Sequence, residues 1–256
     1  MDNKETIIKA GLYLLQHKLI ARTWGNVSAR ESESQFLITP SGKEYTKILY
    51  QDIPLVNIDD CSYNKKGPKP SGEKKVHACI YALRDDARYI VHTHQFYASA
   101  ICAEEKDITL SDGTFVPCAP YGLPGTKKLS NAVKNTVQNN PDCNIFLMAK
   151  HGAIVIGKTM KETLLRAEYL EDECKKIFKR RCPDFYVPEK MNAYLDDYAQ
   201  IMPPAADEDK QAIKMVKEKN AAAYLYIRDA KPISNFDQKL QHTVYKYKYS
   251  KLRNKK

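Results

Sequence analysis

The hydrophobic residues of this chain recur with two different periods, and these periods predict helices that alternate with strands. In residues 4–19 the apolar side chains follow a helical spacing, which is typical of an amphipathic helix that buries one face. Further helices are predicted over residues 73–83, 98–103, 128–139 and 159–180.

Short apolar runs predict the strands. They cover residues 36–38, 89–94, 115–119, 144–149 and 153–157, and a turn in residues 24–28 leads into another strand. Turn-forming residues separate them: Thr39-Pro40-Ser41-Gly42 ends the first run, residues 68–72 form a loop rich in Lys, Pro, Gly and Ser, and residues 121–125 are irregular. Because strands and helices alternate, the sequence predicts an α/β layered domain.

The positive charge is concentrated near the end of the chain. The formal net charge is +10, but seven basic residues and no acidic one follow Asp237. Without them about +3 remains, which is ordinary for a soluble enzyme. We therefore expect residues 1–182 to form one folded domain, and residues 183–256 to form an extension with a helix at 205–226 and a basic, Tyr-rich tail.

The tail has two interpretations. Tyr245, Tyr247 and Tyr249 alternate with Lys246 and Lys248, a pattern that could stack bases and contact phosphates. We favour the alternative, in which the tyrosines of an extended segment pack against the domain or a neighbouring subunit, and we expect no nucleic-acid partner.

The remaining composition excludes several classes of protein. No apolar stretch approaches the ~20 residues that span a bilayer, and residues 1–9 lack a signal-peptide pattern, so we expect no membrane association and a cytoplasmic location. The seven cysteines include no CxxC pair. A disulfide framework and a thiolate zinc cluster are therefore not expected.

Three of the six histidines lie at the ends of predicted strands. His92 and His94 are two positions apart, which in a strand directs both side chains to one face. His151 ends another apolar run, and we expect the following Gly152 to let the backbone turn sharply. A single histidine is commonly just a hydrogen-bonded core residue. Three nitrogen ligands with one open position, however, are typical of a catalytic zinc site.

A carboxylate and three turns complete the candidate chemistry. Glu73 begins a predicted helix, where an anion is favoured and where it is either a general base near a metal or an ordinary helix-terminal charge. Turns rich in Gly and Ser can bind phosphate through backbone N–H groups. Here they are Gly25-Asn26, Thr39-Pro40-Ser41-Gly42 and Ser71-Gly72.

Six short motifs follow one another along residues 5–180. They are Gly25-Asn26-Val27-Ser28, Ile38-Thr39-Pro40-Ser41-Gly42, Ser71-Gly72-Glu73, His92-Thr93-His94, Pro120-Tyr121-Gly122 and His151-Gly152. In order and spacing this set resembles the class II aldolase and adducin head family, above all its L-fuculose-phosphate aldolases and their pentulose-phosphate relatives. The resemblance implies a three-layer αβα domain with a central mixed, mainly antiparallel sheet.

The resemblance also implies roles for individual residues. One Zn²⁺ per subunit would be held by His92, His94, His151 and Glu73, and Glu73 would serve as the acid/base. Tyr121 would donate a proton at the active site of a neighbouring subunit in a homotetramer. The substrate phosphate would be held by Gly25, Asn26, Thr39, Ser41, Gly42, Ser71 and Gly72. Two positions depart from the family pattern, because Gly72 stands where many relatives have Ser and Lys150 where many have Asn or Gln.

The implied reaction is cleavage of a fuculose-, rhamnulose- or ribulose-type ketose 1-phosphate to dihydroxyacetone phosphate and an aldehyde. A sugar-phosphate 4-epimerase of this family tends to have Asp at the position of Glu73, so Glu73 favours the aldolase. A methylthioribulose-phosphate dehydratase would keep the same four residues and stays an alternative. The adducin heads suggest a non-enzymatic interaction module, but the intact set of histidines favours an enzyme.

Overall fold

The computed structural model describes residues 2–20 and 23–183. In this part of the chain a seven-stranded sheet has the order β3-β2-β1-β4-β9-β8-β7. Its strands are β1 (Asn26–Arg30), β2 (Gln35–Ile38), β3 (Leu55–Asn57), β4 (Tyr89–Thr93), β7 (Cys118–Ala119), β8 (Ile145–Met148) and β9 (Gly152–Gly157). Only the β7–β8 pair is parallel, which confirms the expected mixed, mainly antiparallel sheet.

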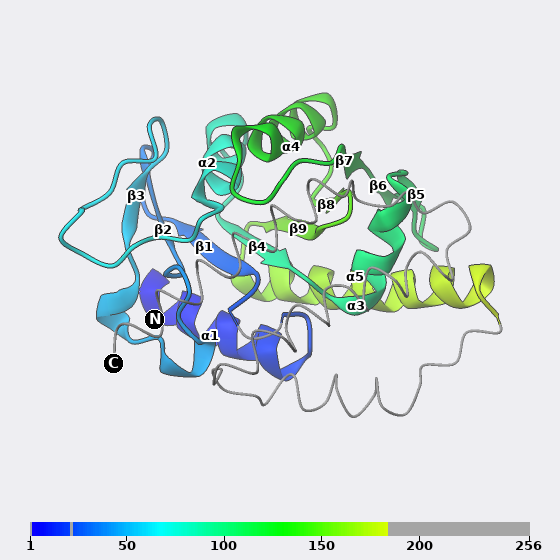
Figure 1. The fold of residues 1–256 in the computed structure, drawn as a ribbon, viewed down its shortest axis with the longest axis horizontal. Helices are drawn as coiled ribbons and strands as arrows, with labels where there is room; N and C mark the ends of the chain where they lie inside the picture. The colour runs from blue at the N-terminus through cyan, green and yellow to red at the C-terminus, as the bar shows by residue number, and fades with distance from the viewer. Residues whose placement is uncertain (1, 21–22, 184–256) are drawn as a thin grey trace.

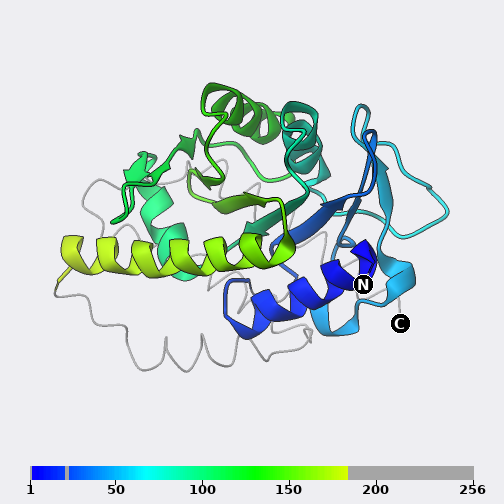
Figure 2. The ribbon, with the colours of Figure 1, turned by 180° about the vertical axis from the view of Figure 1, so that it is seen from behind.

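Helices cover both faces of this sheet, as Figures 1 and 2 show from opposite sides. The α-helices are α1 (Asn3–Gln16), α2 (Lys74–Leu83), α3 (Phe96–Ile101), α4 (Lys127–Asn139) and α5 (Met160–Arg181). Short 3-10 helices are η1 (Tyr45–Lys47), η2 (Tyr50–Asp52) and η3 (Cys102–Glu104). Helices α2 and α4 lie on one face, and α1, α3 and α5 lie on the other. The three-layer αβα prediction is therefore confirmed.

Two hydrophobic clusters, one on each face, hold the layers together. Along β8, Ile145 and Leu147 join the cluster beneath α5, whereas Phe146 and Met148 join the cluster beneath α2 and α4. Successive strand residues point to opposite faces, so a strand covered on both sides must be apolar throughout. This explains why the central strands read as continuous apolar runs without a polar face.

The structure corrects two details of the predicted elements. Residues 115–119 form two strands: β6 (Phe115–Val116) pairs with β5 (Ile108–Thr109) in a separate two-stranded sheet, and β7 joins the main sheet. Pro117 divides them because proline has no N–H to continue a ladder. The prediction also missed β3, a three-residue edge strand whose Leu55 is exposed.

Two further expectations concern residues 184–256 and membrane association. The helix at 205–226, the basic tail and the packing of residues 184–256 fall outside the described ranges. Among the residues that the structure describes, no helix combines the length and the apolarity needed to cross a bilayer.

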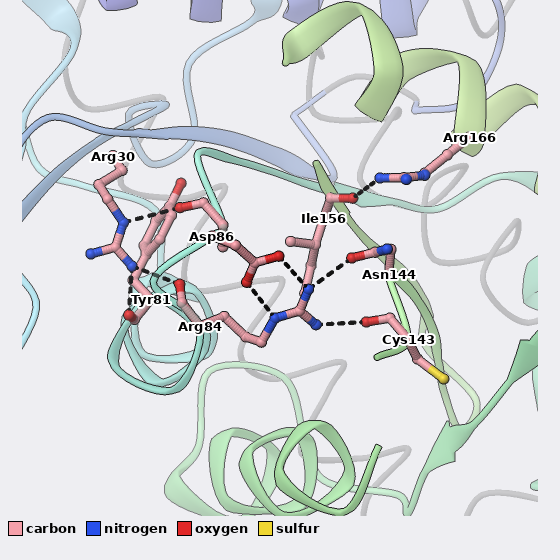
Figure 3. Close-up of polar contacts among 9 residues, drawn as sticks. Arg30, Tyr81, Arg84, Asp86, Cys143, Asn144, Ile156 and Arg166 are labelled. Carbon is pink, nitrogen blue, oxygen red and sulfur yellow. Dashed lines mark hydrogen bonds and ion pairs between the residues drawn. The ribbon is translucent and has the colours of Figure 1, made fainter. Parts of the chain in front are cut away.

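Two arginines fix the C-terminal end of α2 (Figure 3). Arg30 of β1 donates to the carbonyl oxygens of Tyr81, Arg84 and Ala87 at 2.6, 2.9 and 3.0 Å. The side chain of Arg84 bonds both carboxylate oxygens of Asp86 and donates to Cys143 O at 2.8 Å. The last carbonyls of a helix lack partners inside the helix. Arg30 supplies donors to the carbonyls of Tyr81 and Arg84 and ties α2 to β1, whereas the side chain of Arg84 ties the end of the helix to the segment before β8.

Arg30→Met should lower the free energy of unfolding by about 3 kcal/mol, because three backbone carbonyls lose a charged donor. Urea unfolding of the metal-free protein measures the change. Arg88→Met is the control, since Arg88 is exposed and its replacement should change stability by less than about 0.5 kcal/mol. Equal losses in the two variants would show that Arg30 does not hold α2.

Candidate metal centre

The structure brings together the four residues that the sequence suggested as metal ligands. One ligand atom each from Glu73, His92, His94 and His151 lies within 4.8 Å of the other three. His92 is in β4, His94 follows that strand directly, and His151 precedes β9. Strands β4 and β9 pair antiparallel with Thr93 opposite Ala153, so the end of β4 lies beside the start of β9.

Glu73 reaches this cluster from the helical layer that contains α2 and α4. It is the residue that precedes α2, and its side chain is 14% exposed. Its two carboxylate oxygens lie 3.1 Å from Nε2 of His92 and 3.1 Å from Nε2 of His151. Ligand atoms at about 2.0–2.1 Å from a tetrahedral ion stand about 3.3 Å apart. The observed separations are therefore close to those of atoms that share one cation.

The orientation of His92 tests whether the cluster fits a metal. Its Nδ1 atom bonds the carbonyl oxygen of Ala153 at 2.9 Å and must be the donor, so Nε2 of the neutral ring would offer its electron pair to a cation. Within the described residues, this buried Nε2 makes no hydrogen bond, although Glu73 is near. A backbone carbonyl that fixes the second nitrogen is the usual support of a metal-bound imidazole. The donor set of three nitrogens and one carboxylate fits a divalent cation such as zinc.

The electrostatic surroundings keep Glu73 charged. Burial raises the pKa of this carboxyl, but the adjacent His92 and His151 rings outweigh burial and hold the pKa well below its usual value. A carboxylate is thus favoured at this position, as a metal ligand requires.

Gly152 is required for a different reason from the one the sequence suggested. The positive φ in this turn belongs to Lys150, at 57°, and Gly152 is not among the described glycines with positive φ. A Cβ atom at Gly152 would lie 2.2 Å from the carbonyl oxygen of Thr93. The absence of a side chain therefore lets β9 approach β4 closely, which brings His151 to His92.

The three predicted phosphate turns lie around the start of α2. The amide of Ser71 donates to Thr39 O at 3.1 Å, and Pro40 and Pro70 form an isolated bridge, so the second and third turns are side by side. Gly25 adopts a φ of 80°, and a Cβ there would lie 2.7 Å from His92 O.

Three polar side chains of these turns, those of Asn26, Thr39 and Ser71, already have partners inside the protein. Thr39 Oγ1 accepts from the amide of Val27, and Ser71 Oγ accepts from the amide of Glu73. Asn26 donates to Glu73 at 3.0 Å. These bonds hold the turns in place beside the cluster.

Tyr121 lies outside the group of four ligands. It follows β7 and faces the ammonium groups of Lys150 and Lys128, which are 5.3 and 5.9 Å from its ring centroid. Its role at a neighbouring subunit therefore stays a prediction.

Sequence reasoning missed a row of polar residues behind Glu73. Ser28, His77 and Tyr81 are 0, 0 and 1% exposed and are linked by hydrogen bonds. Two signals could have revealed them. His77 and Tyr81 follow Glu73 at intervals of four, which places all three on one helix face. Ser28 is a polar residue in a strand buried at every position.

Comparisons with known proteins agree with this geometry. A family model described as "Class II Aldolase and Adducin N-terminal domain" matches residues 5–177. A probable L-ribulose-5-phosphate 4-epimerase of Mycoplasma pneumoniae is 31% identical over 194 residues, which cover 66% of this chain and 78% of the relative. The L-fuculose phosphate aldolase of Escherichia coli K12 is 31% identical over 172 residues, which cover 64% of this chain and 77% of the relative. A solved L-fuculose 1-phosphate aldolase matches with a TM-score of 0.64 and 24% identity, over 78% of this chain and 97% of that one.

Gly152→Ala should destabilise the metal-free protein by about 2 kcal/mol, because β9 must move away from Thr93 to accept the methyl group. Since His151 moves with it, bound metal should also be lost on dialysis. Urea unfolding and metal analysis check the two effects. Gly67→Ala is the control, because its Cβ would meet no atom closer than 3.5 Å. A Gly152→Ala protein that behaves like Gly67→Ala would refute the close-approach argument.

The buried His77 should make stability depend on pH. Burial, reinforced by His92, lowers the pKa of His77 from 6.5 to about 3. The unfolded chain therefore takes up a proton below pH 6.5 that the folded chain does not, so this contribution to stability is complete above pH 6.5 and declines as the pH falls. At pH 5 the loss is about 2 kcal/mol.

The measurement compares wild type with His77→Gln in urea, with a chelator present. The difference between their free energies of unfolding should shrink by about 2 kcal/mol from pH 7.5 to pH 5, because only wild type carries this histidine. A difference that stays constant with pH would contradict the lowered pKa.

Proposed function

The chain belongs to the class II aldolase and adducin N-terminal domain family, and from this premise we propose that it is a zinc-dependent aldolase that cleaves a ketose 1-phosphate. The chain is an enzyme of the metal-dependent, class II aldolase type. The products would be dihydroxyacetone phosphate and an aldehyde, from a fuculose-, rhamnulose- or ribulose-type substrate. The observation that carries the proposal is the convergence of Glu73 and three histidines on one point.

The residues of the site supply distinct parts of this reaction. When a carbon–carbon bond next to a ketone breaks, negative charge develops on the substrate oxygens, and a cation held by His92, His94 and His151 supplies Lewis-acid stabilisation of that charge. Glu73 would carry the proton to and from the substrate carbon that loses its bond. The turns at Asn26, 39–42 and 71–72 would grip the phosphate, remote from the bond that breaks, and orient the ketone.

Other parts of the proposal concern the assembly. Tyr121 would transfer the proton of the departing aldehyde at the active site of a neighbouring subunit. The assembly would be a homotetramer with active sites between subunits. Residues 1–182 would form the catalytic domain and residues 183–256 an extension. A cytoplasmic location is part of the same proposal.

A sugar-phosphate 4-epimerase is the second candidate, favoured by the 31% identity with the Mycoplasma pneumoniae protein. That reaction also depends on a metal next to a ketone. Glu73 supports the aldolase, since the epimerases of this family tend to have Asp there. A dehydratase of the family would require the same four residues.

The test is metal content of the purified protein, followed by assay of fuculose-, rhamnulose- and ribulose-type 1-phosphates with and without chelator. We expect about one zinc per chain and release of triose phosphate that a chelator abolishes. Zinc without cleavage, but with epimerised or dehydrated product, would replace the aldolase by one of its relatives. Neither metal nor turnover would mean an interaction module.

Glu73→Gln should keep folding and, with zinc supplied in excess, bound metal, but should reduce turnover by about 100-fold or more, because the amide cannot carry the proton. Glu33→Gln is the control, since Glu33 is exposed. Circular dichroism, metal analysis and steady-state kinetics make the comparison. Unchanged turnover in Glu73→Gln would remove this residue from the mechanism.

A further inference from the structure

A row of buried polar side chains runs from Glu73 into the layer between α2 and β1. It consists of Asn26 and Ser28 on the strand and His77 and Tyr81 on the helix, and none is more than 3% exposed. The surrounding cluster is apolar, with Phe36 and Ile90 among its members. Polar groups buried in such a layer are costly unless each finds a partner. The row is therefore stable only as a connected set.

The hydrogen bonds of this row have one consistent direction, which starts from the carboxylate. A charged carboxylate only accepts, so Asn26 Nδ2 donates to Glu73 Oε2 at 3.0 Å. The amide oxygen of Asn26 then faces His77 and must accept from its Nε2–H. This assigns the proton of His77 to Nε2 and leaves Nδ1 as an acceptor.

The remaining two bonds follow from that assignment. Ser28 donates its hydroxyl proton to Nδ1 of His77 at 2.6 Å. Its oxygen accepts from the hydroxyl of Tyr81 at 2.8 Å. A ring that donates at one nitrogen and accepts at the other is neutral, in agreement with the burial that lowers the pKa of His77. The donors thus run from Tyr81 through Ser28, His77 and Asn26 to Glu73.

We propose that His77 is a positioning residue for Glu73, acting through Asn26 to keep one carboxylate oxygen toward His92 and the other toward His151. The inference rests on the proposed function only in taking Glu73 as a metal ligand and proton carrier. The two hydrogen bonds of the His77 ring go to Ser28 and Asn26 and not to a ligand atom of the cluster. Its Nε2–H holds the amide of Asn26 in one orientation, and that orientation presents an N–H rather than an oxygen to the carboxylate.

Loss of this donor has a defined consequence. With an apolar residue at position 77, the buried amide oxygen of Asn26 loses its donor, and the amide is free to turn away from Glu73 in search of another partner. The carboxylate would then leave its position between the histidines. Removing an outer partner of a metal ligand typically weakens metal binding by about 10- to 100-fold.

The test uses Co²⁺ as the probe, because its visible spectrum reports the ligand geometry. Wild type, His77→Leu and His77→Gln are titrated with Co²⁺, and kcat and KM are measured on the substrate found for wild type. Gln places an amide N–H near the position of Nε2 and should bind Co²⁺ within about threefold of wild type. His77→Leu should bind it about 10- to 100-fold more weakly, with a changed spectrum and a lower kcat at similar KM.

Thr163→Val controls for the loss of a buried polar group. Thr163 is 0% exposed and its hydroxyl bonds Thr159 O in another layer, so its replacement should lower stability without changing Co²⁺ binding. His77→Leu that binds Co²⁺ as wild type does would overturn the proposal. The proposal is also overturned if His77→Gln binds Co²⁺ as weakly as His77→Leu does, because the donated N–H would then be irrelevant.

A measurement on wild type keeps the proposal falsifiable even if His77→Leu does not fold. Nitrogen NMR of histidine-labelled protein, with His77 assigned through His77→Gln, should show the proton on Nε2. A proton on Nδ1 would overturn the donor direction. Wild type without affinity for Co²⁺ would overturn both the proposed function and this inference, whereas failure of the variants alone leaves the proposed function standing.

Discussion

A strand advances about 3.3 Å per residue and a helix about 1.5 Å, so two residues of β1 span nearly the same length as four residues of α2. The two elements use this match to stay in register. Asn26 bonds Glu73 and His77, and Ser28 bonds His77 and Tyr81. Because Asn26 also stands opposite His92 in the sheet, the register that aligns α2 with β1 brings Glu73 to the histidines.

The cluster therefore depends on two close approaches from different directions. The first is the polar register between β1 and α2, which Arg30 extends to the C-terminal end of the helix. The second is the packing of β9 against β4, which the missing side chain of Gly152 permits. Apolar packing alone would tolerate small slips of a helix on a sheet, whereas hydrogen bonds at fixed intervals do not. Directional contacts are thus placed where a ligand atom must be held to within a fraction of an ångström.

Local signals in the sequence were sufficient to predict alternating strands and helices and the three histidines at strand ends. The three-layer arrangement and the place of Glu73 among the ligands came from the resemblance to a known family. His92 and His94 follow a continuous apolar run, and such a run is typical of a strand covered on both faces. The split at Pro117, the edge strand β3 and the purpose of Gly152 depend on which strands become neighbours. The role of His77 depends on the pairing of one helix with one strand. Local periodicity contains no information on such long-range pairing.

The start of α2 shows what the site costs the fold. Helices α1, α4 and α5 are preceded by Asp2, Thr126 and Thr159, whose side chains accept from the first turn of the helix. Glu73 occupies the same position before α2 but makes no such bond, since its carboxylate points to His92 and His151. A missing cap costs about 1 kcal/mol. The bonds from Asn26 to Glu73 and from Arg30 to the far end of α2 offset this loss, so α2 gives up its cap at a residue that the proposed chemistry requires.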